Sequence, residues 1–245
     1  MMRLLSVHEV FFTVLGYPMS YLEFFGTALN VLAVWLMTRR NLWAWPIGIA
    51  AVALFAALFY QIRLYADLLE QAYYLGTGFW GWWLWSRGSR NAGERGLPVG
   101  VNTPRVNAIL GAGVLAATGA LGWLTARLHL LAPAWFPAAA SFPYLDAFTT
   151  AMSFAAQLLT VYRRLENWHL WIAVDAISVA LYWQKDVKLV ALLYFVFLVL
   201  AVKGLLAWRA ELAGESVDPL LGEGLAAKGA GCRTEAAGRQ LPQRE

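Results

Sequence analysis

The chain has few charged residues and a single cysteine. Only 14% of its 245 residues are charged, against about 25% in a typical soluble domain, so the composition argues against a water-soluble globule. Because Cys232 is the single cysteine, an intrachain disulfide and a cysteine-rich zinc or iron–sulfur site are excluded. The three histidines do not stand at metal-ligand spacing, and the sequence lacks HExxH, GxSxG and P-loop motifs. We therefore expect no metal, no cofactor and no enzymatic activity.

Hydrophobic residues make up 60% of the chain, with 13 Trp, 13 Phe and 10 Tyr among them. Disordered chains have low hydrophobicity and high charge, so this composition excludes general disorder as well. Aromatic side chains in such numbers are typical of membrane interfaces and of surfaces that stack on ligands. The sequence predicts an all-α polytopic membrane protein.

Apolar stretches predict the membrane helices, each of which needs about 20 mostly apolar residues. We expect residues 1–20 to form an interfacial helix ended at Gly16, 87–105 a basic loop, and 129–144 an outer loop on the membrane surface. The polar residues 211–245 are expected to form a disordered cytoplasmic tail. The seven predicted spans are 21–38, 43–61, 67–86, 106–128, 145–162, 168–184 and 188–208.

Basic residues fall in small clusters between the apolar runs. The formal net charge of +4 therefore does not indicate nucleic-acid binding, which needs basic residues along one face. If the N-terminus is outside, the inner loops hold twice as many Lys and Arg residues as the outer connections. The positive-inside rule then favours an external N-terminus and a cytoplasmic C-terminus.

The first three and the last three spans share features in the same order. One shared feature would be chance, but several in the same order indicate an internal duplication. The matched residues are Glu23 with Asp146, Gly81 with Gly204 and Trp85 with Trp208, each 123 positions apart, and Asn41 with Asn167 and Trp45 with Trp171, each 126 apart.

This duplication predicts two three-helix units, 21–86 and 145–210, separated by residues 87–144 with one linker helix. Three helices invert the chain and the fourth inverts it back, so the units run parallel in a 3+1+3 arrangement. Parallel-repeat transporters of this kind bind their substrate near the bilayer midplane, at the interface between the repeats.

Asp175 is a carboxylate near the middle of the sixth span, with no Lys or Arg close to it in the sequence. Ionisable groups inside a bilayer are costly, so they mark candidate functional sites. Asp175 shares one helix face with Trp168, Trp171, Ser178 and Tyr182. A flat ligand could stack there on a tryptophan while Asp175 accepts hydrogen bonds from its hydroxyls. The alternative is that Asp175 only ties neighbouring helices together.

Polar residues in other spans extend the candidate site. Gln71 and Tyr74 share a face of the third span with two glycines, and an amide can both donate and accept. The alternative for this face is helix–helix hydrogen bonding and close packing. Gln157 in the fifth span and Asn30 in the first complete the set of candidate substrate-binding residues. Apart from Lys203, and from Arg127 and Lys188 at the ends of their spans, the spans contain no Lys or Arg, so they favour an uncharged or cationic flat solute over a phosphate.

Four segments together resemble the PnuC family of vitamin transporters, namely 15–26, 41–49, 71–85 and 167–182. The family's WxxWxxxD pattern falls on Trp168, Trp171 and Asp175, and its glutamine–tyrosine pattern on Gln71 and Tyr74. The resemblance implies facilitated uptake of nicotinamide riboside across a bacterial inner membrane. It also implies a SWEET-like 3+1+3 fold and a homotrimer.

Other functions stay open at this point. Thiamine is also a flat cation, and riboflavin is carried by close relatives within the resembled family. An intramembrane enzyme would need a nucleophile–base pair or a metal set, and the sequence shows neither. A passive structural or sensor protein would bind a ligand without moving it across the bilayer.

Overall fold

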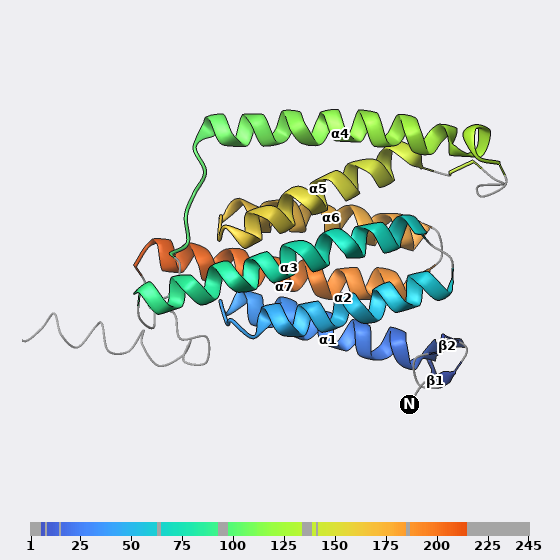
Figure 1. Ribbon diagram of the computed structural model, residues 1–245, viewed down its shortest axis with the longest axis horizontal. Helices are drawn as coiled ribbons and strands as arrows, with labels where there is room; N and C mark the ends of the chain where they lie inside the picture. Colours follow the sequence, from blue (N-terminus) through green and yellow to red (C-terminus); the bar gives the residue numbers. More distant parts are fainter. Residues whose placement is uncertain are drawn as a thin grey trace, which may run out of the picture.

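Seven helices account for most of the residues that the computed structural model describes (Figure 1). Those residues are 6–7, 9–14, 16–62, 65–92, 98–133, 139–140, 142–184 and 187–214. The helical class expected from the sequence is confirmed. The helices are α1 (Tyr21–Thr38), α2 (Ala44–Gln61), α3 (Tyr65–Ala92), α4 (Pro104–Leu131), α5 (Pro143–Val161), α6 (Glu166–Gln184) and α7 (Lys188–Leu212).

Four of these helices, α1, α2, α4 and α7, are long and apolar enough to cross a membrane by length and composition. The other three, α3, α5 and α6, carry polar side chains that include Glu70, Gln157 and Asp175. This difference has a physical reason, because helices that line a polar interior cannot be uniformly apolar.

Several predicted boundaries need correction. The basic loop expected from residue 87 begins later, because α3 continues through Ala92. The outer loop is shorter than expected at both ends, since α4 continues to Leu131 and α5 begins at Pro143. Proline suits the first turn of a helix because its missing N–H would be unpaired there anyway. Most of the predicted tail lies outside the described residues.

The expected interfacial helix at the N-terminus is wrong, because the segment forms a β-hairpin. Strands β1 (Val10–Val14) and β2 (Tyr17–Ser20) pair antiparallel around Gly16, which has a φ of 85° that suits glycine. Valine, phenylalanine and threonine in β1 favour strands over helix. The side chains of Ser20 and Glu23 then form a capping box that starts α1. The Tyr17 hydroxyl donates to Glu23 Oε1 over 2.6 Å, which ties the hairpin to this helix.

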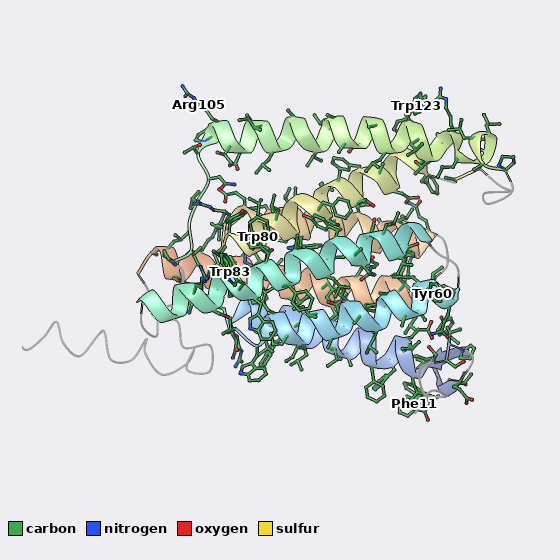
Figure 2. The ribbon with its side chains drawn as sticks, viewed as in Figure 1. Phe11, Tyr60, Trp80, Trp83, Arg105 and Trp123 are labelled. Carbon is green, nitrogen blue, oxygen red and sulfur yellow. The ribbon has the colours of Figure 1, made fainter. Side chains whose placement is uncertain are left out.

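Six helices form a closed ring in which each packs against the next, in the order α1, α2, α3, α5, α6, α7 and back to α1. Helix α4 packs along α5 on the outside of this ring (Figure 1). Arg105 and Trp123 on α4 point away from the other helices (Figure 2). Much of the α4 surface is therefore left for a lipid or protein environment.

The turns α1–α2 and α5–α6 lie at the same end of the bundle, opposite the hairpin, and we call this the turn end (Figure 1). Both turns place an arginine in the left-handed region, Arg40 at φ 58° and Arg163 at φ 51°. Their backbone hydrogen bonds recur at a spacing of 123 residues. Arg40 N–H donates to Met37 O and Asn41 N–H to Leu36 O, as Arg163 N–H donates to Thr160 O and Arg164 N–H to Leu159 O.

The same spacing relates Trp45 to Trp168, because their N–H groups donate to Leu42 O and Leu165 O respectively. The sequence comparison that matched Trp45 with Trp171 is therefore wrong at this turn. That comparison aligned Asn41 with Asn167, whereas the backbone hydrogen bonds align Arg40 with Arg163.

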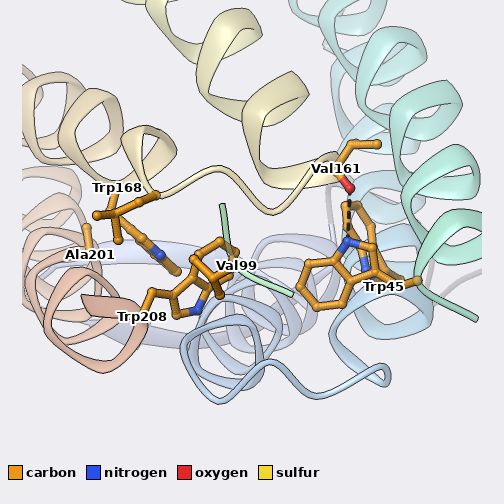
Figure 3. Close-up of a cluster of buried hydrophobic side chains, with 8 residues drawn as sticks. Trp45, Val99, Val161, Trp168, Ala201 and Trp208 are labelled. Carbon is orange, nitrogen blue, oxygen red and sulfur yellow. Dashed lines mark hydrogen bonds between the residues drawn. The ribbon is translucent and has the colours of Figure 1, made fainter. Parts of the chain in front are cut away.

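Trp45, Trp85, Trp168 and Trp208 form the tryptophan cluster at the turn end (Figure 3). The ring centroids of Trp45 and Trp85 lie 5.4 Å apart at 82°, and those of Trp168 and Trp208 lie 5.4 Å apart at 89°. Trp85 and Trp208 connect the two pairs, with centroids 6.3 Å apart. Edge-to-face contacts of this kind add to the stabilisation that burial provides.

Two glycines make this cluster possible. A Cβ atom on Gly81 would lie 2.1 Å from the Trp45 ring, and one on Gly204 would lie 2.5 Å from the Trp168 ring. Each indole therefore packs directly on the backbone of the neighbouring helix. The close-packing interpretation of the glycines in the third span is confirmed at Gly81.

Replacing Gly81 by alanine should destabilise the protein by about 1–3 kcal/mol, because the added methyl group must displace a buried indole. The control is Gly113→Ala on α4, where a Cβ atom would meet nothing within 4 Å. Helix propensity alone favours alanine at both positions. Thermal unfolding in detergent should show a lower Tm for the first variant and an unchanged or higher Tm for the control. Equal Tm values would contradict the packing argument.

Candidate functional site

The contact between α3 and α5 is made by polar side chains along one face of α3. Four side-chain hydrogen bonds cross it, spaced over two turns of helix. Thr150 Oγ1 donates to Glu70 Oε1 (2.9 Å), Tyr73 Oη donates to Phe154 O (2.8 Å), the side chains of Tyr74 and Ser153 are hydrogen-bonded, and Gln157 Nε2 donates to Thr77 Oγ1 (3.4 Å).

A second set of polar side chains lies between α6 and α7. Tyr194 is hydrogen-bonded to Ser178, and its ring stacks on Tyr182 with centroids 5.4 Å apart at 9°. Tyr194 also lies close enough to Asp175 and to Tyr74 for electrostatic interaction. Tyr194 therefore joins the polar residues of α6 to those of α3.

Tyr74, Ser153, Asp175, Ser178 and Tyr194 together form what we call the central polar group. Four helices, α3, α5, α6 and α7, contribute to it. The group contains hydroxyls and one carboxylate but no basic side chain. Its chemistry suits hydroxyl, amide or cationic partners rather than an anion.

Asp175 is the residue of this group with the highest energetic cost. It is only 5% exposed, and within the described residues its carboxylate has no hydrogen bond or ion pair. A buried carboxylate without a partner is costly, so such a group is retained where it has a function. Its oxygens are free to accept hydrogen bonds from a solute.

The structure brings four of the predicted site residues together. Tyr74 and Asp175 belong to the central polar group, Tyr182 stacks on its Tyr194, and Gln157 bonds Thr77 one turn from Tyr74.

The other four predicted residues are placed differently. Trp171 is half-buried and packs against the tryptophan cluster, and its Nε1 donates to Thr160 Oγ1 over 3.5 Å. Gln71 is buried, with its amide 3.5 Å from the Asp67 carbonyl of its own helix. Asn30 is half-buried on α1.

Trp168 lies inside the tryptophan cluster, 2% exposed, with its ring against Gly204. It shares the inward face of α6 with Asp175, but seven residues of helix separate them by about 10 Å along the axis.

Sequence reasoning missed Tyr194 because the seventh span reads as a uniformly apolar helix. The available signal was the repeat, since Tyr194 stands 123 positions after Gln71. Glu70 was not among the predicted site residues, yet its carboxylate accepts a hydrogen bond from Thr150 on another helix. Within the described residues, no group of three or more His, Cys, Asp and Glu side chains could hold a metal ion.

Two hollows lie on the surface and away from the central polar group. One, of about 430 Å³, is lined by Phe79, Trp82, Trp83, Ser86 and Arg87. The other, of about 310 Å³, is lined by Leu84, Pro98, Val99, Gly100, Tyr162 and Arg164. The candidate site therefore rests on the convergence of buried polar side chains.

Comparison with known proteins identifies the family. A family model described as nicotinamide mononucleotide transporter matches residues 20–210, which include every helix of the ring almost completely. The chain belongs to this family. The resemblance to PnuC proteins seen in the sequence is thereby confirmed, and the chain is a multi-pass membrane protein of a transporter family rather than of an enzyme family.

Curated relatives agree with this assignment. The nicotinamide riboside transporter PnuC of Escherichia coli is 28% identical over 211 residues, covering 79% of this chain and 87% of the relative. PnuC of Neisseria mucosa is 25% identical over 202 residues, covering 78% of this chain and 73% of the relative. The riboflavin/roseoflavin transporter RibM of Streptomyces davaonensis is 24% identical over 184 residues, covering 75% and 82%.

A solved structure, the crystal structure of the vitamin B3 transporter PnuC, is similar to this chain with a TM-score of 0.61. The match covers 80% of this chain and 83% of the other at 22% sequence identity. At this identity the likeness shows a shared fold.

Removing the Tyr194 hydroxyl should lower stability by about 1 kcal/mol, because Tyr194→Phe leaves Ser178 without its buried partner. Tyr60→Phe is the matched control, since Tyr60 is 66% exposed at the hairpin end of α2 (Figure 2). Thermal unfolding of both variants in detergent measures the difference. A loss of stability no larger than that of the control would remove Tyr194 from the buried hydrogen-bonding network.

Proposed function

We propose that the protein carries nicotinamide riboside across the bacterial inner membrane by facilitated diffusion. The observation that carries this proposal is the buried, unpaired Asp175 among aromatic hydroxyls at the centre of the ring. The names of the E. coli and N. mucosa relatives support the same substrate.

The substrate's chemistry matches the residues available. Nicotinamide riboside has a cationic pyridinium ring, a carboxamide and ribose hydroxyls. Asp175 would accept hydrogen bonds from the hydroxyls and offset the positive charge, and aromatic rings such as Trp171 and Tyr182 would face the pyridinium. The side-chain amides of Gln71 and Gln157 would bind the carboxamide.

The remaining predicted residues take lesser roles in this proposal. Asn30 and Tyr74 would contribute further hydrogen bonds from α1 and α3. Trp168 would act through the packing of α6, because its ring is enclosed by the tryptophan cluster.

The family model's description names the mononucleotide, whereas the central polar group favours the riboside. A phosphate needs arginine, lysine or a helix N-terminus as its partner. The central polar group offers a carboxylate and hydroxyls instead, so a phosphorylated solute would meet repulsion from Asp175.

Thiamine and riboflavin remain the alternatives. Thiamine is also a flat cation, so the same charge argument applies to it. Riboflavin is favoured by a specific observation, the similarity to RibM. Its ring system is uncharged, so it would make less use of the Asp175 charge.

We infer that the ring consists of two parallel three-helix units, 21–86 and 145–210, with α4 as linker helix. Support comes from the 123-residue recurrence of the turn hydrogen bonds, and from contacts in which α3 meets α5 as α7 meets α1. The two units would rock about the central polar group to alternate access.

We also propose that the turn end faces the cytoplasm, with the N-terminus outside. Four arginines, Arg39, Arg40, Arg163 and Arg164, lie in the two turns at this end, as the positive-inside rule favours. The homotrimer proposed for the assembly rests on the family resemblance.

Purified protein in liposomes without an ion gradient should take up labelled nicotinamide riboside saturably, because facilitated diffusion needs only a substrate gradient. Excess unlabelled nicotinamide riboside should block uptake, whereas thiamine, riboflavin and nicotinamide mononucleotide should not. Liposomes without protein are the control. Uptake abolished by thiamine or riboflavin would assign the protein to that vitamin, and binding without uptake would indicate a sensor.

Asp175→Asn should weaken the apparent affinity for nicotinamide riboside about ten- to a hundredfold, because a charge-assisted hydrogen bond is worth about 1.5–3 kcal/mol. The control is Glu9→Gln, which also removes one carboxylate but at an exposed position beside the hairpin. Uptake at substrate concentrations below half-saturation measures the effect. Unchanged uptake by Asp175→Asn would exclude this residue from the site.

A further inference from the structure

A short segment between α3 and α4, residues 98–102, is bound to the α5–α6 turn, and we call it the strap. Gly100 N–H donates to Arg163 O (3.0 Å), and Leu165 N–H donates to Gly100 O (2.9 Å). Asn102 N–H donates to Glu166 Oε1 over 2.7 Å. The strap thus connects the chain that leaves α3, in the first unit, to a turn of the second unit.

Val99 anchors the strap in the tryptophan cluster. Its side chain is only 7% exposed and belongs to the same buried cluster as Trp85 and Trp208. Figure 3 shows Val99 between Trp208 and Trp45 in the view drawn. Since Trp85 lies toward the C-terminal end of α3 and Trp208 toward that of α7, Val99 lies where the two units meet at the turn end.

The two equivalent turns differ in what covers them. In the α1–α2 turn, Arg40 is exposed and forms an ion pair with Glu211 of α7. In the α5–α6 turn, Arg163 is 4% exposed, and its guanidinium carbon lies 4.7 Å from the Trp85 ring centroid. The strap accounts for this difference, because it covers the second turn and has no counterpart among the described residues at the first.

The turn that the strap covers contains buried polar atoms without hydrogen-bond partners, and their burial carries an energetic cost. Arg163 Nε, Glu166 Oε2 and Asn167 Oδ1 are all buried without a hydrogen-bond partner. Burial lowers the pKa of Arg163 to about 10, so its guanidinium stays charged at neutral pH. Unpaired buried polar atoms are costly, and access of water would relieve that cost. In its observed position the strap gains stability from the burial of Val99. The same position keeps these polar atoms away from water, and that energetic cost disappears when the strap leaves.

We propose that the strap is a latch, which must leave its position between α3 and α7 before substrate can pass out of the turn end. The latch rests on the proposed transport function. It regulates release from the central polar group and leaves binding from the hairpin end unaffected. The strap also forms a wall of the surface hollow lined by Leu84 and Tyr162, which leaves open space beside it.

A disulfide across the strap tests the latch. Gly100 and Arg164 pair in a β-bridge, so Gly100→Cys with Arg164→Cys, in a Cys232→Ser background, places two thiols within disulfide reach. After oxidation, uptake into liposomes should fall at least tenfold and recover with reductant, while binding of labelled nicotinamide riboside persists. The matched control is Thr13→Cys with Pro18→Cys, paired residues of the hairpin, whose oxidation should leave uptake unchanged. Full uptake by the oxidised strap pair would overturn the latch.

A second measurement does not depend on the substrate. Ala201 is 2% exposed in the same buried cluster as Val99, so a cysteine there reports on opening of the turn end. In the Cys232→Ser background, Val99→Gly should raise the labelling rate of Ala201→Cys by a membrane-impermeant maleimide several-fold. Equal rates with and without Val99→Gly would overturn the latch. Failure of the parent protein to take up nicotinamide riboside would contradict the proposed substrate, and the labelling rates would still decide the latch.

Discussion

Contact between indole rings and bare helix backbone determines how the turn end is built. Trp45 packs on Gly81 and Trp168 packs on Gly204, at distances that no β-carbon would allow. These two contacts bring α2 against α3 and α6 against α7, and they hold the rings where Trp85 and Trp208 can meet. The ends of α3 and α7, the covered Arg163 and the position of the strap all depend on this arrangement.

The central polar group is built from polar side chains, in contrast to the aromatic packing of the tryptophan cluster. Polar side chains there join helices through hydrogen bonds, as between Thr150 and Glu70 or between Tyr194 and Ser178. In a low-dielectric surrounding such networks are strong when satisfied and costly when incomplete. Asp175 has no hydrogen bond among the described residues, so under the proposed function it favours a solute with hydroxyl groups or positive charge over an apolar one.

Much of this architecture follows from apolar run length, and the first predicted span, 21–38, coincides with α1. The hairpin did not follow, because an amphipathic pattern over a short segment does not distinguish a helix from two strands. Residue spacing placed Trp168 and Asp175 on one face correctly, yet it could not show that the Trp168 ring is enclosed by Trp208 from another helix. Tyr194 was missed because the seventh span reads as a uniformly apolar helix, although its spacing of 123 residues from Gln71 was an available signal.

The 123-residue recurrence of the turn hydrogen bonds also matches positions on α6 with positions on α2. Counting back from Asp175, Ser178 and Tyr182 on α6 leads to Val52, Phe55 and Phe59 on α2. At these three positions α6 therefore carries polar side chains where α2 carries apolar ones. If a solute binds between the two proposed units, its polar groups find partners on α6 and not at the matching positions of α2, so one orientation of the solute is favoured over the reverse.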